Sequence, residues 1–236
     1  MSRTRLGTVS TVANSGERLP LRERKKQRTR QSLIDAALDL FTERGFDGVT
    51  LDELCDSVEV SKRTFFRYFT SKEDVAMASI YDLWMRFVDE LGTVEAQGRT
   101  ILEMMRDALL ASLEGMADED WLRRVLLTER LGAANTSMAA HCLEFCERTM
   151  RLALKVVADR FDLPGPDDLR LRLAGDMLVS AFRHGMSDWT AQAQDGAGPH
   201  AGKRPAERDL AAHVLDAVAA LNSSLTLSAP LRSTAH

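Results

Sequence analysis

Basic and hydroxyl-bearing side chains gather in the sequence SKRTFFRY, from Ser61 to Tyr68. Ser61 is suited to an N-cap, so a short helix is predicted over residues 62 to about 69. The apolar residues of this segment recur at the spacing of one buried stripe, which leaves the others on a shared outward face: Lys62, Arg63, Thr64, Arg67 and Tyr68. Cations pair with phosphates and guanine edges, and hydroxyl groups add hydrogen bonds. This face is therefore suited to the major groove of DNA.

A second short helix is predicted just upstream, where it would support the basic one. Thr50 and Glu53 have the spacing of a capping box, so this helix should begin at Leu51. Its apolar residues fall at helical spacing and should form one packed face. Two short helices joined by a tight turn, the second of them basic, are typical of the helix-turn-helix reader of DNA. The alternative is a small three-helix domain whose basic face is only solvated.

The run VSKRTFFRYFTSKEDV resembles the signature of the TetR (tetracycline-repressor) family of bacterial transcription regulators. The upstream segment QSLIDAALDLFTERGFDGVTLDELC resembles the first helix of that family and the start of its second helix. At the level of motifs the resemblance covers residues 25 to 76. Two positions depart from the family pattern: Glu59 stands where glycine is common, and Phe66 stands where a DNA-contacting tyrosine is usual.

The resemblance also implies particular contacts with double-stranded operator DNA. Thr50, Tyr68 and Lys72 match family positions that hold phosphates. Together with the outward face of the basic helix, they complete the set of residues expected at the DNA: Arg28, Thr50, Ser61, Lys62, Arg63, Thr64, Phe66, Arg67, Tyr68 and Lys72.

Charge is distributed unevenly along the chain. Residues 1–34 contain nine Lys and Arg against two Glu, a net charge of +7, which leaves −11 for the remainder of a chain whose total is −4. A basic end on an acidic body is typical of a DNA-binding head joined to a sensing or dimerising body. The basic run at 22–30 is expected to contact DNA phosphates, the alternative being a solvated helix start.

Composition and motifs disfavour several other classes of protein. Three cysteines in 236 residues are too few for a disulfide framework, which indicates a reducing cytoplasm. No apolar run approaches about 18 residues, so no transmembrane helix is expected. The common catalytic and cofactor-binding motifs are missing, so neither an enzyme nor a cofactor is predicted. The alternative function is a helical adaptor or an enzyme that does not bind DNA.

Cys142 and Cys146 share a helical face and lie next to His141. They could bind a metal or act as a redox pair. A structural zinc site needs four ligands, however, and no second cluster supplies them. Buried free cysteines are the preferred interpretation, and no metal site is predicted.

The rest of the chain is predicted to be helical, because it shows helical periodicity and no strand pattern. A helix at 72–91 is long enough to connect head and body, and the resemblance implies that it transmits ligand binding to the DNA-reading heads. Further helices are expected at about 99–116, 118–132, 136–161, 166–192 and 205–225. The all-α chain should divide into a disordered tail (1–20), a helix-turn-helix head (21–71), a ligand-binding and dimerisation body (72–226) and a disordered tail (227–236).

Two roles are expected of the body. Apolar stripes on its last two helices should form a homodimer interface, unless they pack only within one chain: Leu178, Val179, Phe182, Val214, Leu215 and Val218. Adaptable side chains should line a cavity for a small, largely apolar effector, unless they are ordinary core: Trp84, Met104, Trp121, Phe145 and Met177. The expected function is a ligand-responsive regulator, a repressor that binds a palindromic operator as a homodimer.

Overall fold

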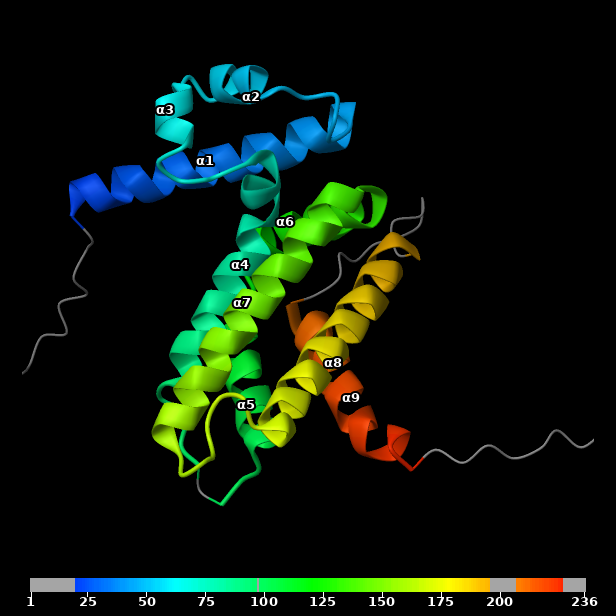
Figure 1. The fold of residues 1–236 in the computed structure, drawn as a ribbon. Coiled ribbons are helices and arrows are strands. Elements are labelled where there is room, and N and C mark those ends of the chain that lie inside the picture. The colour runs from blue at the N-terminus through cyan, green and yellow to red at the C-terminus, as the bar shows by residue number, and fades with distance from the viewer. Residues whose placement is uncertain (1–19, 97, 196–206, 227–236) are drawn as a thin grey trace, which may run out of the picture.

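The computed structural model describes residues 20–96, 98–195 and 207–226, and within them the chain forms nine α-helices and no strand (Figure 1). The all-α prediction is confirmed. The tail expected at 227–236 lies outside the described residues, as does the one expected at 1–20 except for Pro20. Three helices form the head: α1 (Leu21–Arg44), α2 (Leu51–Ser57) and α3 (Lys62–Phe65).

The body is built around α4 (Lys72–Leu91), which runs from the head along the length of the molecule (Figure 1). Three helices pack on it: α5 (Ile101–Glu114), α6 (Glu119–Ala134) and α7 (Thr136–Arg160). The last two, α8 (Leu169–Asp195) and α9 (Glu207–Ser224), pack mainly on each other. All body helices fall within a few residues of their predicted positions.

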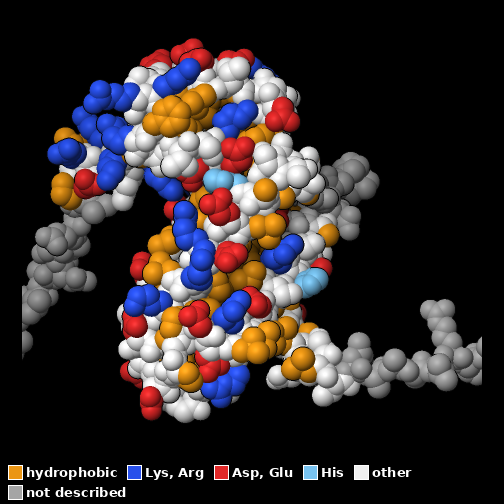
Figure 2. All heavy atoms as spheres, viewed as in Figure 1, with side chains coloured by type: hydrophobic (Ala, Val, Ile, Leu, Met, Phe, Trp, Pro, Cys, Tyr) orange, Lys and Arg blue, Asp and Glu red, His pale blue; other side chains and the backbone are white. Residues whose placement is uncertain are grey.

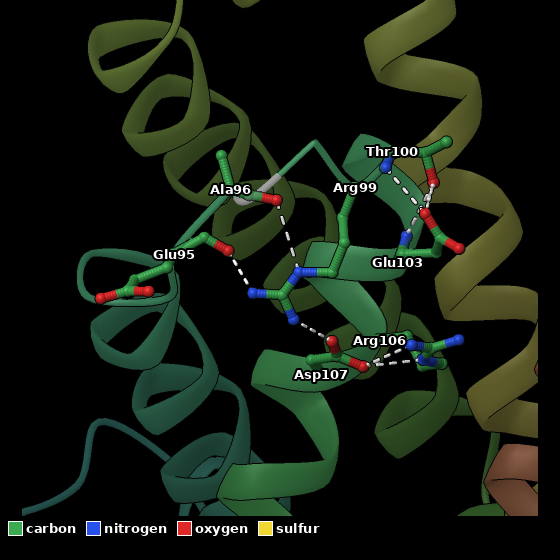
Figure 3. Close-up of polar contacts among 7 residues, drawn as sticks. All are labelled: Glu95, Ala96, Arg99, Thr100, Glu103, Arg106 and Asp107. Carbon is green, nitrogen blue, oxygen red and sulfur yellow. Dashed lines mark hydrogen bonds and ion pairs between the residues drawn. The ribbon is translucent and has the colours of Figure 1, made fainter.

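Local capping explains where several helices begin. The capping box at α2 is present, since Glu53 N donates to Thr50 Oγ1 at 3.2 Å and Thr50 N donates to Glu53 Oε2 at 2.8 Å. Thr100 and Glu103 repeat this arrangement at α5 (Figure 3). Each box satisfies backbone N–H groups that have no partner inside the helix.

Three ion pairs join α1 of the head to the body: Arg30–Asp82, Arg124–Asp35 and Arg123–Asp39. The Arg30 guanidinium donates two hydrogen bonds, of 2.8 and 2.9 Å, to the carboxylate of Asp82 on α4. Arg124 of α6 has a side chain only 13% exposed, so its pair is screened less by water than an ordinary surface pair. The head is therefore attached to α6 as well as to α4.

The basic helix is shorter than predicted. It is α-helical from Lys62 to Phe65, whereas the prediction extended to about Phe69. Beyond Phe65 the backbone tightens, because Tyr68 N donates to Phe65 O, three residues back, at 2.8 Å. Such three-residue bonds close the last turn as a tighter helix. Phe69 is still buried at 2% exposure, so the expected apolar stripe is kept.

Four of the six residues expected at a dimer interface are buried within one chain: Leu178, Phe182, Val214 and Val218. Helices α8 and α9 cross closely at Gly185, where an added Cβ would lie 2.7 Å from the Cα of Val214. The missing side chain lets the two backbones meet, and this contact buries the facing stripes. These four side chains thus pack within one chain, and their part in a dimer interface stays a prediction. Val179 is half-buried, and Leu215 is 43% exposed.

Candidate nucleic-acid interface

Buried aromatic residues orient α3 so that its cationic side faces outward. Phe65 is fully buried, and its ring lies 5.6 Å from that of Phe69. Ser61 caps the helix by accepting a hydrogen bond from Thr64 N at 3.2 Å. The exposed residues of the segment include Lys62, Arg63, Phe66 and Arg67. Lys and Arg side chains gather over this end of the head (Figure 2).

The three cations on this face differ in how they are held. Lys62 Nζ lies 2.8 Å from Asp52 of α2, and this hydrogen bond raises the pKa of the lysine. Arg67 lies over the Tyr68 ring at 5.0 Å and donates to its hydroxyl at 3.2 Å. Arg63 has no partner among the described residues. Its guanidinium therefore keeps all its donors for a guanine edge or a phosphate.

Lys72, which is expected to hold a phosphate, binds two backbone carbonyls inside the head. Its Nζ donates to the carbonyls of Phe46 and Val49 at 2.7 and 2.6 Å. It also lies 4.7 Å from the centre of the Phe46 ring. Because two of its three protons are used in this way, Lys72 secures the loop between α1 and α2.

Two other expected contacts have hydroxyl groups that already bind inside the head. Thr50 Oγ1 donates to Glu53 Oε2 at 2.8 Å, and Thr64 Oγ1 lies 3.1 Å from Ser61 Oγ. The backbone N–H groups of Thr50 and Thr64 are also used inside the head, by Glu53 and Ser61 respectively.

The turn between α2 and α3 contains Glu59, with a φ of 55°. This is the left-handed region that favours glycine, the residue that the family commonly has at this position. The turn is formed in spite of the Cβ, and Val60 N still donates to Cys55 O at 3.0 Å. The departure at Glu59 therefore does not prevent the turn between the two helices from forming.

The structure brings the basic run of α1 beside the end of the α3 segment. A cleft of about 500 Å³ separates them, lined by Arg22, Glu23, Lys25, Lys26, Thr29, Arg67 and Tyr68. Arg28 is exposed on α1 and lies outside this lining, while Arg30 is taken up by Asp82. Residues about 40 positions apart in sequence thus form one cationic surface, which the sequence pattern showed only as two separate runs.

Replacing both Arg22 and Lys25 by alanine is expected to weaken binding to every DNA sequence alike. If each contacts one phosphate, the slope of log K against log salt should become shallower by about 0.9 per contact, or about 1.8 for each bound chain. Fluorescence anisotropy over a salt series measures this slope. The matched control removes two exposed arginines of the body, Arg130 and Arg172, and should leave the slope unchanged. Equal slopes for both variants would show that this cleft does not meet DNA.

A second hollow, a groove of about 880 Å³, lies between α7 and α8. Its apolar lining includes Leu143, Met150, Leu154 and Val179, and its charged lining includes Arg151, Arg172 and Arg183. None of the five residues expected to line an effector cavity lines this groove.

Four of those five residues are buried in the packed interior, and the fifth, Met177, is half-buried. Trp84 makes edge-on contacts with Phe87 and Phe182 at 5.3 and 5.1 Å between ring centres. Trp121 donates from Nε1 to the carbonyl of Ser79 at 3.1 Å. Phe145 stacks on a tyrosine of α4, and Met104 is 2% exposed. The core interpretation thus accounts for the contacts that the structure shows.

No helix in the described ranges is long and apolar enough to cross a membrane. The same residues contain no group of three or more His, Cys, Asp or Glu side chains placed to hold a metal ion.

Comparison with known proteins points to one family. Residues 33–78 match the model of a family described as bacterial regulatory proteins, tetR family. Over 183 residues, 73% of its length, the chain is 31% identical to the HTH-type transcriptional regulator TcmR of Streptomyces glaucescens, of which 78% is covered. It is 25% identical to the putative mycofactocin biosynthesis transcriptional regulator MftR of Mycobacterium tuberculosis, over 70% of this chain and 83% of that one. The fold is similar to that of the fatty acid degradation regulator FadR of Bacillus halodurans, with a TM-score of 0.52 at 19% identity, covering 85% of this chain and 97% of that one.

Proposed function

The chain belongs to the tetR family of bacterial regulatory proteins and is a DNA-binding transcriptional regulator. On this premise we propose that it is a homodimeric repressor, which a small, largely apolar effector releases from a palindromic operator. It is not an enzyme, since the family consists of transcription regulators. The cytoplasm, where the operator lies, is its proposed location. The observation that carries the proposal is the cationic face of α3, which buried aromatic residues hold outward. On this face Arg63 has no partner among the described residues, so its guanidinium is available to DNA.

A gel-shift experiment with the DNA upstream of its own coding region tests the DNA-binding part. The protein should retard this DNA, and an excess of the same unlabelled fragment should compete while unrelated DNA of equal length should not. A lipophilic extract of the native host should then release the DNA, and mass spectrometry of the protein-bound fraction should identify the compound. Equal competition by both DNAs would contradict a specific operator at this site.

The outer faces of α8 and α9 support the homodimer. After the two helices have packed on each other, Leu173 and Leu215 remain 49% and 43% exposed. Exposed leucines on adjacent helices can complete a four-helix bundle with a second copy. A two-fold protein also matches a palindromic operator, whose half-sites would lie about 34 Å apart or a multiple of that distance.

Leu215→Glu is expected to convert the dimer into a folded monomer. The side chain is 43% exposed in one chain, so a carboxylate is tolerated there, whereas in a dimer it would be buried without a partner. Light scattering at micromolar concentration measures the mass, and circular dichroism checks the fold. Leu143→Glu on α7 is the control, because Leu143 is 64% exposed and lies outside α8 and α9. A monomeric unmodified protein would rule out this interface.

Effector control would act through the contact between α7 and α4. An effector in the α7–α8 groove would bear on α7, which packs along α4, and α4 joins the head directly. The ligand can shift the separation of the heads only by its differential affinity for the two arrangements. A tenfold loss of operator affinity requires about 1.4 kcal/mol of coupling, which is within the usual range for allosteric proteins.

A further inference from the structure

Two of the three cysteines lie together at the α7–α8 groove. The sulfur atoms of Cys142 and Cys146 are 3.9 Å apart, both residues are half-buried, and Cys146 lines the groove. The third, Cys55, is 2% exposed in the core of the head. We propose that Cys142 and Cys146 are a redox-active dithiol, in which Cys146 reacts with a hydroperoxide entering from the groove and Cys142 then closes a disulfide.

Their position relative to the groove distinguishes the two thiols, because Cys146 lines it and Cys142 does not. The contact between the two sulfur atoms lowers the pKa of Cys146 and raises that of Cys142, while burial raises the pKa of both. The charges nearby act on both thiols alike, since Arg183 on α8 lowers the pKa of each and Glu129 on α6 raises the pKa of each. Cys146, which lines the groove, is therefore the thiol placed to meet an oxidant from solvent. A thiolate with access to solvent and a second thiol beside it is the arrangement that oxidation favours.

The chemistry balances with a hydroperoxide as the oxidant. The Cys146 thiolate attacks the terminal peroxide oxygen, an S–O bond forms, the O–O bond breaks, and the departing alkoxide takes a proton from water to become an alcohol. Cys142 then attacks the sulfenic sulfur, an S–S bond forms, and hydroxide leaves with the Cys142 proton as water. Two thiols lose two electrons in all, and the hydroperoxide gains them.

Closing this bond must deform α7. Residues four apart on a helix have Cβ atoms about 5–6 Å apart, whereas a disulfide holds them at about 3.5–4.5 Å. The turn that must tighten contains Phe145, whose ring stacks on Tyr81 of α4 at 3.7 Å between centres and 17° between planes. Tyr81 is 9% exposed, and its hydroxyl has no hydrogen-bond partner among the described residues, so ring packing is what holds it. A disulfide between Cys142 and Cys146 would therefore disturb α4, the helix that joins the body to the head.

Thiol titration and mass spectrometry after treatment with hydrogen peroxide test the proposal, and neither measurement depends on DNA. The number of free thiols should fall from three to one, with the mass loss of two hydrogens and a peptide that joins Cys142 to Cys146. Cys55 is the internal control and should react at least about tenfold more slowly, because it is buried and its pKa is raised. A disulfide to Cys55 or to a second copy, or three intact thiols, would overturn the proposal.

Single substitutions identify the role of each thiol. Cys142→Ser should leave a sulfenic acid on Cys146 that dimedone traps, while Cys146→Ser should leave Cys142 unmodified over the same interval. Both changes replace sulfur by oxygen at half-buried positions, so both variants should fold, which circular dichroism checks. If dimedone labels Cys142 in the Cys146→Ser variant as strongly as Cys146 in the Cys142→Ser variant, the assigned roles are wrong.

The effect on DNA rests on the proposed function and is measured separately. Oxidised protein should bind its operator at least about tenfold more weakly, and reduction should restore the affinity. The variant with both cysteines replaced by serine should keep its affinity in peroxide. If the disulfide forms and affinity is unchanged, the coupling through Tyr81 is wrong. If even the reduced protein ignores its operator, the proposed function fails, and the thiol measurements still decide the dithiol.

Discussion

Arg63→Ala is expected to cause the largest loss of operator affinity of any single substitution in the head. A bidentate contact of arginine with guanine contributes about 1–3 kcal/mol of discrimination, and a homodimer makes it twice, so the expected loss is about 2–6 kcal/mol. Arg63 is exposed on α3 and has no partner among the described residues, so its removal disturbs no internal contact. Fluorescence anisotropy with operator and unrelated DNA measures both the affinity and the preference.

The pattern of loss separates base recognition from simple charge. Affinity should fall for the operator far more than for unrelated DNA, and the preference at one base pair of each half-site should relax. Arg130→Ala is the matched control, because it removes the same charge from an exposed position on α6. Unchanged affinity and unchanged preference for Arg63→Ala would show that another face of the head reads DNA.

Lys72→Met is expected to destabilise the protein by about 2–4 kcal/mol while leaving the salt dependence of DNA binding unchanged. Methionine keeps much of the apolar stem but removes the ammonium that binds the carbonyls of Phe46 and Val49. Hydrogen bonds from a charged donor contribute about 1.5–3 kcal/mol each, and this site is partly exposed, which reduces the sum. Urea unfolding measures the stability.

A matched substitution and the DNA measurement make this second expectation specific. Lys155→Met removes the ammonium of an exposed ion pair with Asp159 and should cost less than about 1 kcal/mol. A phosphate contact predicts the opposite pattern for Lys72→Met, with little change in unfolding and a slope shallower by about 0.9 per contact. If Lys72→Met is about as stable as the unmodified protein, the carbonyl contacts do not stabilise the head, and a phosphate contact becomes the better assignment for Lys72.

The sequence by itself determined the features that depend on neighbouring residues. The capping box at Thr50, the N-cap at Ser61 and the apolar stripe through Phe65 each arise within a few positions of the chain, so spacing alone predicted α2 and the start of α3. The same local periodicity located the helices of the body. Local hydrogen bonds and one-sided burial provide the physical reason, because both follow from the helical repeat.

Only the tertiary structure decided which side chains are free. Lys62 and Lys72 looked alike as cations in the sequence, yet one pairs with Asp52 and the other binds carbonyls more than 20 positions away. The crossing at Gly185 decided that Leu178 is buried within one chain and that Leu215 stays exposed there. Contacts of this kind join residues far apart in sequence, and their partners depend on how the helices cross, which no local spacing records.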